Sequence, residues 1–141
     1  MRKVVLALVA WSLVGLYSAT ASAEHLHTVK TSGIMFKDSI EVHVFDDPTI
    51  GGVSCYYTMP KRSMSFEDQT NSSISCRQVG RITGELVTKS HLMKASKGLF
   101  VKSLVIDRVY DSTRHVLVYL TYTKKMYGDN ASNSISVVPI R

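Results

Sequence analysis

Two adjacent carboxylates, Asp46 and Asp47, stand in the stretch VFDDPTIGG, between an apolar run and the first cysteine. Paired carboxylates can share a proton or hold a ligand when their oxygens converge on one point. Neighbouring residues of a strand point to opposite faces, so this pair is not placed to converge. Asp47 also precedes Pro48, which favours an extended or turn backbone, and Asp commonly bonds backbone amides in turns. We therefore predict a strand end followed by a turn, with a binding role as the alternative.

A second charged group lies further along the chain, in the stretch VIDRVYDSTRHV. Arg108 and Tyr110 share one parity of a predicted strand, and Asp111 and Arg114 stand at the turn that follows. Arg and Tyr are enriched at binding hot spots, so the four residues form a candidate binding patch. The alternative, which we favour, is a cluster of surface ion pairs of little energetic consequence.

The histidines give little evidence for a metal site. His43 and His115 have no His, Cys or carboxylate at a spacing typical of metal ligands. His25 and His27 are weak candidates, because cleavage before Glu24 would place both near a free α-amine that could help to bind copper(II). No nucleophile elbow or phosphate-binding glycine loop is present. We predict no catalytic residues, no cofactor and no enzymatic activity.

The elements that would position these side chains are predicted to be strands. Apolar residues alternate with polar ones, and Val, Ile, Thr and Tyr are frequent, as strands prefer. The runs cover residues 40–44, 53–59, 74–77, 100–110, 116–122 and 135–140. The most reliable local prediction is a hairpin around the turn Asp111 to Arg114. The sequence predicts one all-β domain of antiparallel strands, a sandwich or a partly open barrel, with room for one short helix.

Two segments do not fit this pattern. Residues 24–33 are polar, and we expect a leader that frays or docks late. Residues 82–94 fit either one short helix or another strand.

The N-terminus is typical of a cleavable secretory signal. Arg2 and Lys3 precede a long apolar run, which ends at the small-residue site Ala21-Ser22-Ala23. We expect cleavage after Ala23, with residues 1–23 removed and residues 24–141 forming a single domain. The predicted location is the periplasm, without a stable membrane anchor after cleavage; an uncleaved membrane helix is the alternative.

The two cysteines, Cys55 and Cys76, are predicted to form a disulfide, because an even number of cysteines in an exported chain usually pairs. Both share a parity with apolar neighbours, so the sulfur atoms should face the core and join two strands or two sheets. A redox-active pair is the alternative, but the chain has no Cys-x-x-Cys motif.

Charge limits the partners. The chain has a net charge of +6, of which Arg2 and Lys3 supply two, and its basic residues are scattered. Nucleic acid requires a concentrated basic surface, so it is not predicted as a partner. An envelope protein or a small polar ligand is the expected partner. Most of the tyrosines of the strand runs, Tyr56, Tyr57, Tyr110, Tyr119 and Tyr122, are expected in the core or in cross-strand pairs. A tyrosine-lined groove for such a ligand is the alternative.

Five stretches, in this order, resemble the CreA family of small exported bacterial proteins: VFDDP, GVSCYY, SISCRQVG, KSLVIDRVYDSTRHVLVYLTY and NSISVVPI. The resemblance runs from about Val42 to Ile140 and implies a periplasmic protein whose biochemical activity is not established. It carries over no catalytic residues. The chain departs from the family in a short stretch after Pro60, KRSMSF, and at Asp107, where relatives carry an apolar residue.

From the residues and the resemblance together we expect a non-enzymatic binding or envelope-accessory protein. The alternatives are a small periplasmic hydrolase whose residues converge only in the fold, and a weak metal-handling protein. The hydrolase would require a cleft that holds His43 or His115 beside a carboxylate.

Overall fold

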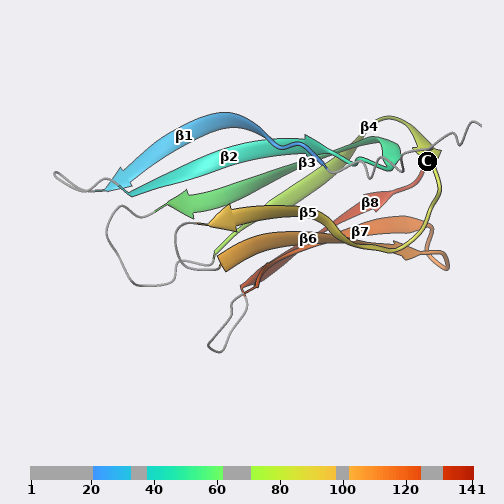
Figure 1. Ribbon diagram of the computed structural model, residues 1–141. Coiled ribbons are helices and arrows are strands. Elements are labelled where there is room, and N and C mark those ends of the chain that lie inside the picture. The colour runs from blue at the N-terminus through green and yellow to red at the C-terminus, as the bar shows by residue number, and fades with distance from the viewer. Residues whose placement is uncertain (1–20, 33–37, 62–70, 98–101, 125–131) are drawn as a thin grey trace, which may run out of the picture.

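The computed structural model describes residues 21–32, 38–61, 71–97, 102–124 and 132–141, and the regular structure within these ranges is entirely β. The predicted all-β class is confirmed, and the described ranges contain no helix (Figure 1). The strands are β1 (Glu24–Ser32), β2 (Asp38–Asp46), β3 (Ile50–Lys61), β4 (Ile74–Gly84), β5 (Lys89–Lys97), β6 (Lys102–Asp111), β7 (Val116–Lys124) and β8 (Asn133–Pro139).

The strands form two antiparallel sheets that pack face to face as a sandwich (Figure 1). One sheet has the order β1-β2-β3-β4 and the other β5-β6-β7-β8, so the chain finishes the first sheet before it starts the second. Alternate residues of each strand face the space between the sheets, where their burial supplies the main stabilising term. The most deeply buried members of the hydrophobic core are Phe45, Ile50, Val53, Cys55, Tyr57, Leu104, Ile106, Leu117, Tyr119 and Val138.

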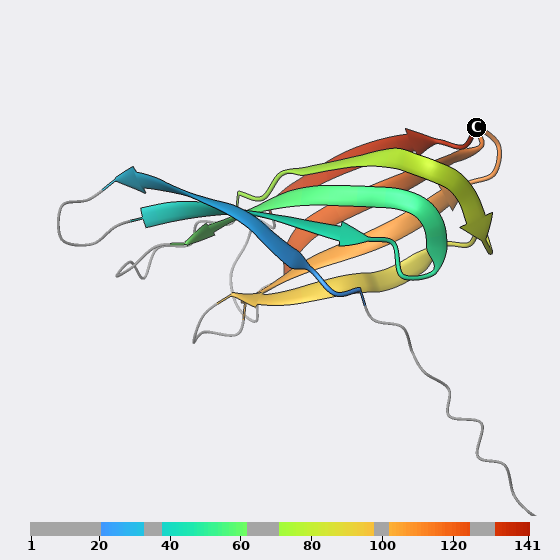
Figure 2. The same cartoon turned by 90° about the horizontal axis from the view of Figure 1, so that it is seen from above.

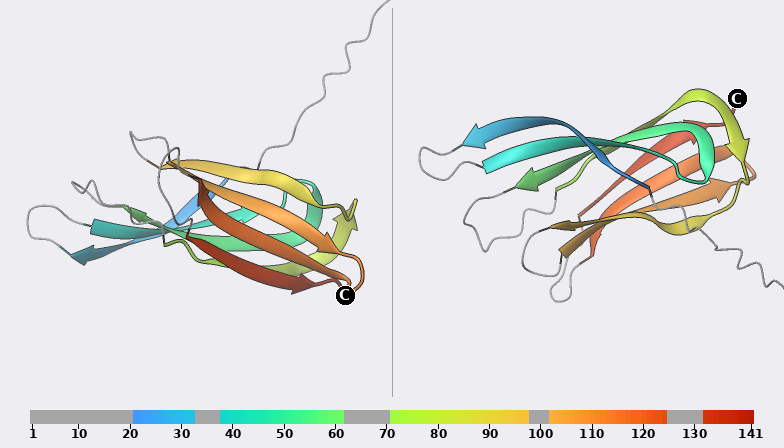
Figure 3. Two further views of the ribbon diagram at one scale, coloured as in Figure 1. Left: turned by 90° about the horizontal axis from the view of Figure 1, so that it is seen from below. Right: turned by 45° about the horizontal axis from the view of Figure 1, so that its top comes forward.

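On one side of the sandwich the edge strands β4 and β8 lie next to each other (Figures 2 and 3). They are not joined in a common ladder, although the amide of Cys76 donates a hydrogen bond to the Ser136 hydroxyl at 2.8 Å. The other two edge strands are β1 and β5. The fold is therefore a sandwich that approaches barrel closure along the β4–β8 side.

Residues 24–32 do not form the frayed leader that we expected, because they are strand β1, paired with β2 in register from Glu24 opposite Val44 to Ser32 opposite Asp38. Residue 33, the last of the expected leader, lies outside the described residues. An edge strand of an antiparallel sheet can be exposed on both faces, so it needs no apolar alternation. Residues 24–31 of β1 are all exposed, so the sequence there has no alternation of apolar and polar residues that would predict a strand.

Residues 82–84 end β4 and residues 89–94 begin β5, with residues 85–88 as the connection between them, so the strand alternative is correct for the regular parts of this segment. The β5 ladder shifts register between Lys89 and Met93, and His91 within this bulge has a φ of 53°. Four residue steps on β5, from Lys89 to Met93, oppose two on β6, and the adjacent residues Leu92 and Met93 are both buried, so the period of two is interrupted. This irregularity explains why the segment carried no clear strand pattern.

The predicted disulfide between Cys55 and Cys76 is confirmed. The two residues are directly opposite each other on β3 and β4, so the bond joins neighbouring strands of one sheet rather than the two sheets. Cys55 is completely buried, and its sulfur lies within the hydrophobic core as its parity indicated.

Two sequence predictions lie outside the described residues: most of the signal segment, because residues 1–20 are not described, and the shortened stretch after Pro60, from residue 62 on. Within the described ranges, no helix is long and apolar enough to cross a membrane.

Candidate functional site

The most extensive polar contacts of the described residues begin at Asp47, in the turn between β2 and β3. Its Oδ1 accepts hydrogen bonds from the backbone amides of Thr49 and Ile50, each at 2.9 Å. An aspartate that bonds the amides two and three residues ahead is a common turn device. The predicted turn is therefore present. Asp46 lies on the other face, exposed, and accepts a hydrogen bond from the Ser54 hydroxyl, so the two carboxylates diverge as expected.

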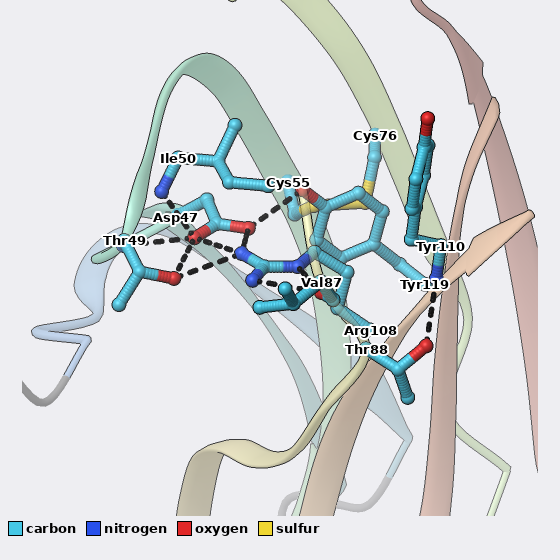
Figure 4. A network of polar contacts seen from close by, with 10 residues as sticks. All are labelled: Asp47, Thr49, Ile50, Cys55, Cys76, Val87, Thr88, Arg108, Tyr110 and Tyr119. Atoms are coloured by element: carbon cyan, nitrogen blue, oxygen red, sulfur yellow. Dashed lines mark hydrogen bonds and ion pairs between the residues drawn. A yellow bond between two sulfur atoms is a disulfide. The ribbon is translucent and has the colours of Figure 1, made fainter. Parts of the chain in front are cut away.

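Asp47 also reaches across to the opposite sheet. One guanidinium nitrogen of Arg108 on β6 donates to both carboxylate oxygens, at 2.7 and 2.6 Å. The Tyr119 hydroxyl on β7 donates to Oδ2 at 2.7 Å (Figure 4). The side chains of Asp47 and Arg108 have no exposed surface. We call the contacts among Asp47, Thr49, Val87, Arg108 and Tyr119 the inter-sheet network.

The remaining nitrogens of Arg108 are also satisfied. Nε and the second terminal nitrogen donate to the Val87 carbonyl at 3.2 and 3.1 Å, and the first donates to the Thr49 hydroxyl at 2.9 Å. Val87 lies in the segment that leads from β4 to β5, where the chain passes from one sheet to the other. The Arg108 side chain therefore connects β6, on which it lies, to the β2–β3 turn and to the segment between β4 and β5.

Glycine permits the close approach that this turn requires. Gly84, at the end of β4, has a φ of 101°, a backbone conformation that residues with a Cβ rarely adopt. A Cβ at this position would collide with the Thr49 carbonyl. The absence of a side chain at Gly84 thus lets the end of β4 pack against the turn that presents Asp47.

Electrostatics favour an ionised Asp47 in the folded protein. Burial raises the pKa of Asp47, but hydrogen bonds from Arg108, the Thr49 amide and Tyr119, together with the charge of Arg108, outweigh it and leave the pKa below its usual value. Burial and the hydrogen bond to the carboxylate raise the pKa of Tyr119 well above that of a free tyrosine. The network therefore holds a charged carboxylate, a guanidinium and a neutral phenol.

This pKa shift predicts loss of stability in acid. A folded-state pKa below the unfolded value contributes stability above the unfolded pKa of about 3.9, and that contribution disappears as the pH falls through the folded pKa. At pH values below about 4, we expect the free energy of unfolding of the wild type to decrease. The difference in this free energy between the wild type and Asp47→Asn should become smaller over the same range. Denaturant titrations between pH 7 and pH 2 measure both. The surface variant Asp111→Asn should keep most of the wild-type profile; an advantage over Asp47→Asn that stays constant with pH would contradict the assignment.

The network is suited to holding the sheets together rather than to catalysis. Both oxygens of Asp47 already accept hydrogen bonds from protein donors, and neither its side chain nor that of Arg108 is accessible to a substrate. Breaking one partner of a buried pair is strongly destabilising, because it leaves the other charge buried and uncompensated. The sequence did not link these residues, but Arg108 has the same parity as Leu104 and Ile106, which indicated that it faces the core.

The structure sets Arg108 apart from the other three residues of the candidate binding patch, which lie at the β6–β7 turn or next to it. Arg108 is completely buried, whereas Asp111 and Arg114 form an ion pair of 2.9 Å at the exposed β6–β7 turn. The hydrogen bonds from Arg114 hold the pKa of Asp111 below its usual value. Tyr110 is half-buried, and its hydroxyl lies 3.3 Å from Nδ1 of His115. The surface ion pair is therefore present, but Arg108 does not belong to it.

A second polar cluster lies on β2 and β3. His43 Nε2 is 3.0 Å from Glu41 Oε2, and the Lys61 ammonium is 2.5 Å from the other oxygen of Glu41. Burial raises the pKa of Glu41, but hydrogen bonds from Lys61 and His43 and their charges leave it lowered. The ring of His43 stacks on Tyr57, whose pKa burial and Glu41 raise to about 12.

This cluster meets one part of the requirement for a hydrolase, a histidine beside a carboxylate. The hydrogen bonds described for His43 include no Ser, Thr or Cys side chain that could serve as a nucleophile. The carboxylate that would orient the imidazole is shared with Lys61. The described contacts therefore give the hydrolase hypothesis no complete catalytic set.

His25 and His27, the weak metal candidates, lie on β1. His25 Nε2 is 2.8 Å from the Thr28 hydroxyl, and its ring lies edge-on to that of His43. In the β1–β2 ladder His25 lies opposite His43. Among the residues that the structure describes, no three His, Cys, Asp or Glu side chains are grouped so that they could hold a metal ion.

The family model described as CreA protein matches residues 26–141, which is most of the chain. The chain belongs to the CreA family. Its CreA relatives include Protein CreA of Escherichia coli (strain K12), which is 34% identical over 134 residues, with 85% of each chain covered. Protein CreA of Escherichia coli O157:H7 shows the same identity and coverage. No solved structure matches the chain. CreA membership thus agrees with the resemblance noted in the sequence, and the relatives' names state no activity.

Proposed function

We propose that this CreA-family protein is exported to the periplasm, where it acts as a non-enzymatic binding or envelope-accessory protein. The observation that carries the proposal is the disulfide between Cys55 and Cys76. Disulfides persist in oxidising compartments such as the periplasm and are rare in the cytosol. The sequence of Arg2-Lys3, an apolar run and Ala21-Ser22-Ala23 supports the same location.

The binding role is supported by how the described residues use their polar chemistry. The Asp47–Arg108 pair lies between the sheets without exposed surface and serves the fold. The outer surface in contrast exposes apolar side chains of β6 and β8, including Val109 at 42%, Ile135 at 60% and Val137 at 49%. A disulfide-stabilised sandwich that presents apolar residues on its outside suits recognition of another molecule.

Export predicts a defined mature N-terminus. The cell-associated protein should be recovered from the periplasmic fraction, and its N-terminal sequence should begin at Glu24, because Ala21-Ser22-Ala23 is the processing site. A variant with bulky residues at Ala21 and Ala23 should accumulate unprocessed. Recovery of the wild type in the cytosol with Met1 still attached would refute export.

The binding role is tested separately. The oxidised protein can be crosslinked in intact cells, and the attached proteins and ligands identified by mass spectrometry. A partner recovered in stoichiometric amounts supports the role. A hydrolytic activity that survives purification and is abolished by His43→Ala would instead favour the enzyme alternative.

A further inference from the structure

A groove of about 350 Å³ lies at the seam between the edge strands β4 and β8, which run side by side in the same direction (Figures 2 and 3). Its lining includes Arg77 and Gln78 from β4 and Val137 and Pro139 from β8, with Arg141 after the strand. The Cys76 amide, bonded to the Ser136 hydroxyl, lies at one end of the shared edge. The groove thus lies beside the hydrogen bond that connects the two strands.

The ladders of both sheets show which backbone groups face this seam. Along a strand, the N–H and C=O groups of successive residues alternate between its two sides. The Cys76 amide points to β8, so the backbone of Gln78, two residues on, faces the seam as well. The Ile140 amide bonds the His115 carbonyl beside β7. Residues of the opposite parity on β8, Val137 and Pro139, therefore turn their backbone groups toward the seam.

These edge groups are not used in pairing between the two strands. Over the ranges that the structure describes, no backbone–backbone hydrogen bond connects β4 to β8. Pro139 fits this arrangement, because proline is tolerated in a strand where its nitrogen faces away from the ladder. An unpaired strand edge is a template for an added strand, unless a neighbouring element covers it.

Side chains around the groove add a charge and an apolar surface. Arg77 and Arg141 are both exposed, and the residues that line the groove include no acidic side chain. Val137 is 49% exposed, and Val79, the next outward-facing residue of β4 after Arg77, is 56% exposed. An occupant that carries both carboxylates and apolar side chains would complement this surface.

We propose that the β4–β8 seam binds an extended acidic peptide segment of a partner protein. The segment adds to the exposed edge of β8, with its backbone bonded to Val137, and its carboxylates pair with Arg77 and Arg141. Strand addition of this kind takes its affinity from main-chain hydrogen bonds and its specificity from alternate side chains. Charge-assisted pairing of guanidinium and carboxylate selects for acidic segments. The inference rests on the proposed binding role and names the class of partner.

The test uses two synthetic peptides with blocked ends, one of alternating glutamate and valine and one of alternating lysine and valine. Binding of each to the purified, oxidised protein is measured by titration calorimetry at low salt. The glutamate peptide should bind, and the lysine peptide should bind at least about tenfold more weakly, because one charge-assisted contact is worth roughly that factor. Equal binding of the two peptides, or no binding of either, would overturn the proposal.

Variants locate the contact. Arg77→Gln combined with Arg141→Gln should weaken the glutamate peptide by about tenfold or more. Lys30→Gln removes an exposed cation on β1, the edge of its sheet opposite to β4, and should leave binding unchanged. Val137→Pro removes the edge amide at a position where the ladder does not use it, and should also abolish binding. Equal loss in Lys30→Gln, or full binding by Val137→Pro, would contradict strand addition at the seam.

One further arm separates a protein partner from a lipid surface. Vesicles containing phosphatidylglycerol are titrated with the wild type, the double arginine variant and Val137→Pro. Binding to vesicles that needs the arginines but not the Val137 amide, without binding of the glutamate peptide, would replace the peptide with an anionic membrane. The glutamate peptide could fail to bind although the protein is recovered from the periplasm and crosslinks to a partner. That result would refute peptide binding at the seam and leave the proposed function intact.

Discussion

Replacement of Arg108 by alanine should lower the free energy of unfolding by roughly 3–5 kcal/mol, because it removes one partner of a buried ion pair. The loss leaves the Asp47 carboxylate without its guanidinium and the Val87 carbonyl without its two donors. It also leaves a cavity where a long side chain with no exposed surface had packed. Equilibrium unfolding in urea, monitored by far-ultraviolet circular dichroism, measures the change.

Two further variants distinguish the charge from the packing. Arg108→Met keeps an unbranched apolar chain, and when it is combined with Asp47→Leu both charges are gone. Replacement of a whole buried pair by apolar residues is often nearly neutral, so the double variant should be more stable than either single one. Arg114→Ala, which breaks the exposed ion pair, should leave the urea midpoint unchanged within error. Additive losses in the double variant would show that the pair is not coupled.

The second large effect concerns the disulfide. Replacing both Cys55 and Cys76 by alanine should lower the free energy of unfolding by about 2–5 kcal/mol, as for native disulfides in small secreted domains. The bond closes a loop with a sequence separation of 21 residues, and the chain-entropy account assigns about 3 kcal/mol to a loop of this order. Changing both residues avoids a free thiol, which could form mixed disulfides and obscure the measurement.

The wild type under reducing conditions supplies the matched comparison. If the stabilisation comes from the covalent link, the reduced wild type and the double alanine variant should unfold at similar denaturant concentrations. Because both sulfur atoms are held in the disulfide and neither is a free thiol, alkylating reagents should label neither in the native oxidised protein. Ready alkylation without a reductant, or an unchanged midpoint in the double variant, would contradict a stabilising disulfide.

The sequence predicted the fold class well because burial on one face of a strand leaves a period of two. This pattern identified the strands that line the core, and the even cysteine count identified the bond between β3 and β4. It missed β1, because an edge strand exposed on both faces leaves no such pattern. It could not decide between helix and strand around His91, because the bulge in β5 breaks the period.

The sequence predicted only one part of the inter-sheet network, the turn at Asp47. Asp47 before Pro48 indicated a turn, and that turn is present. The partner of Asp47 lies 61 residues away on the other sheet, and no local pattern specifies which strand faces which across a sandwich. The clue that could have been used is parity: a charged residue that alternates with Leu104 and Ile106 on an apolar face requires a buried partner.

The connections of Asp47 also bear on how the chain assembles. Its contacts with Arg108 and Tyr119 span 61 and 72 residues, whereas the β6–β7 hairpin brings together residues that are close in sequence. Closing a long loop costs entropy before its contacts repay it, so local hairpins form sooner than distant contacts. The two sheets can therefore align through these contacts only after β7 is present, when most of the chain is available to fold. Until then, the faces that will later meet across the sandwich stay exposed to solvent and to other proteins.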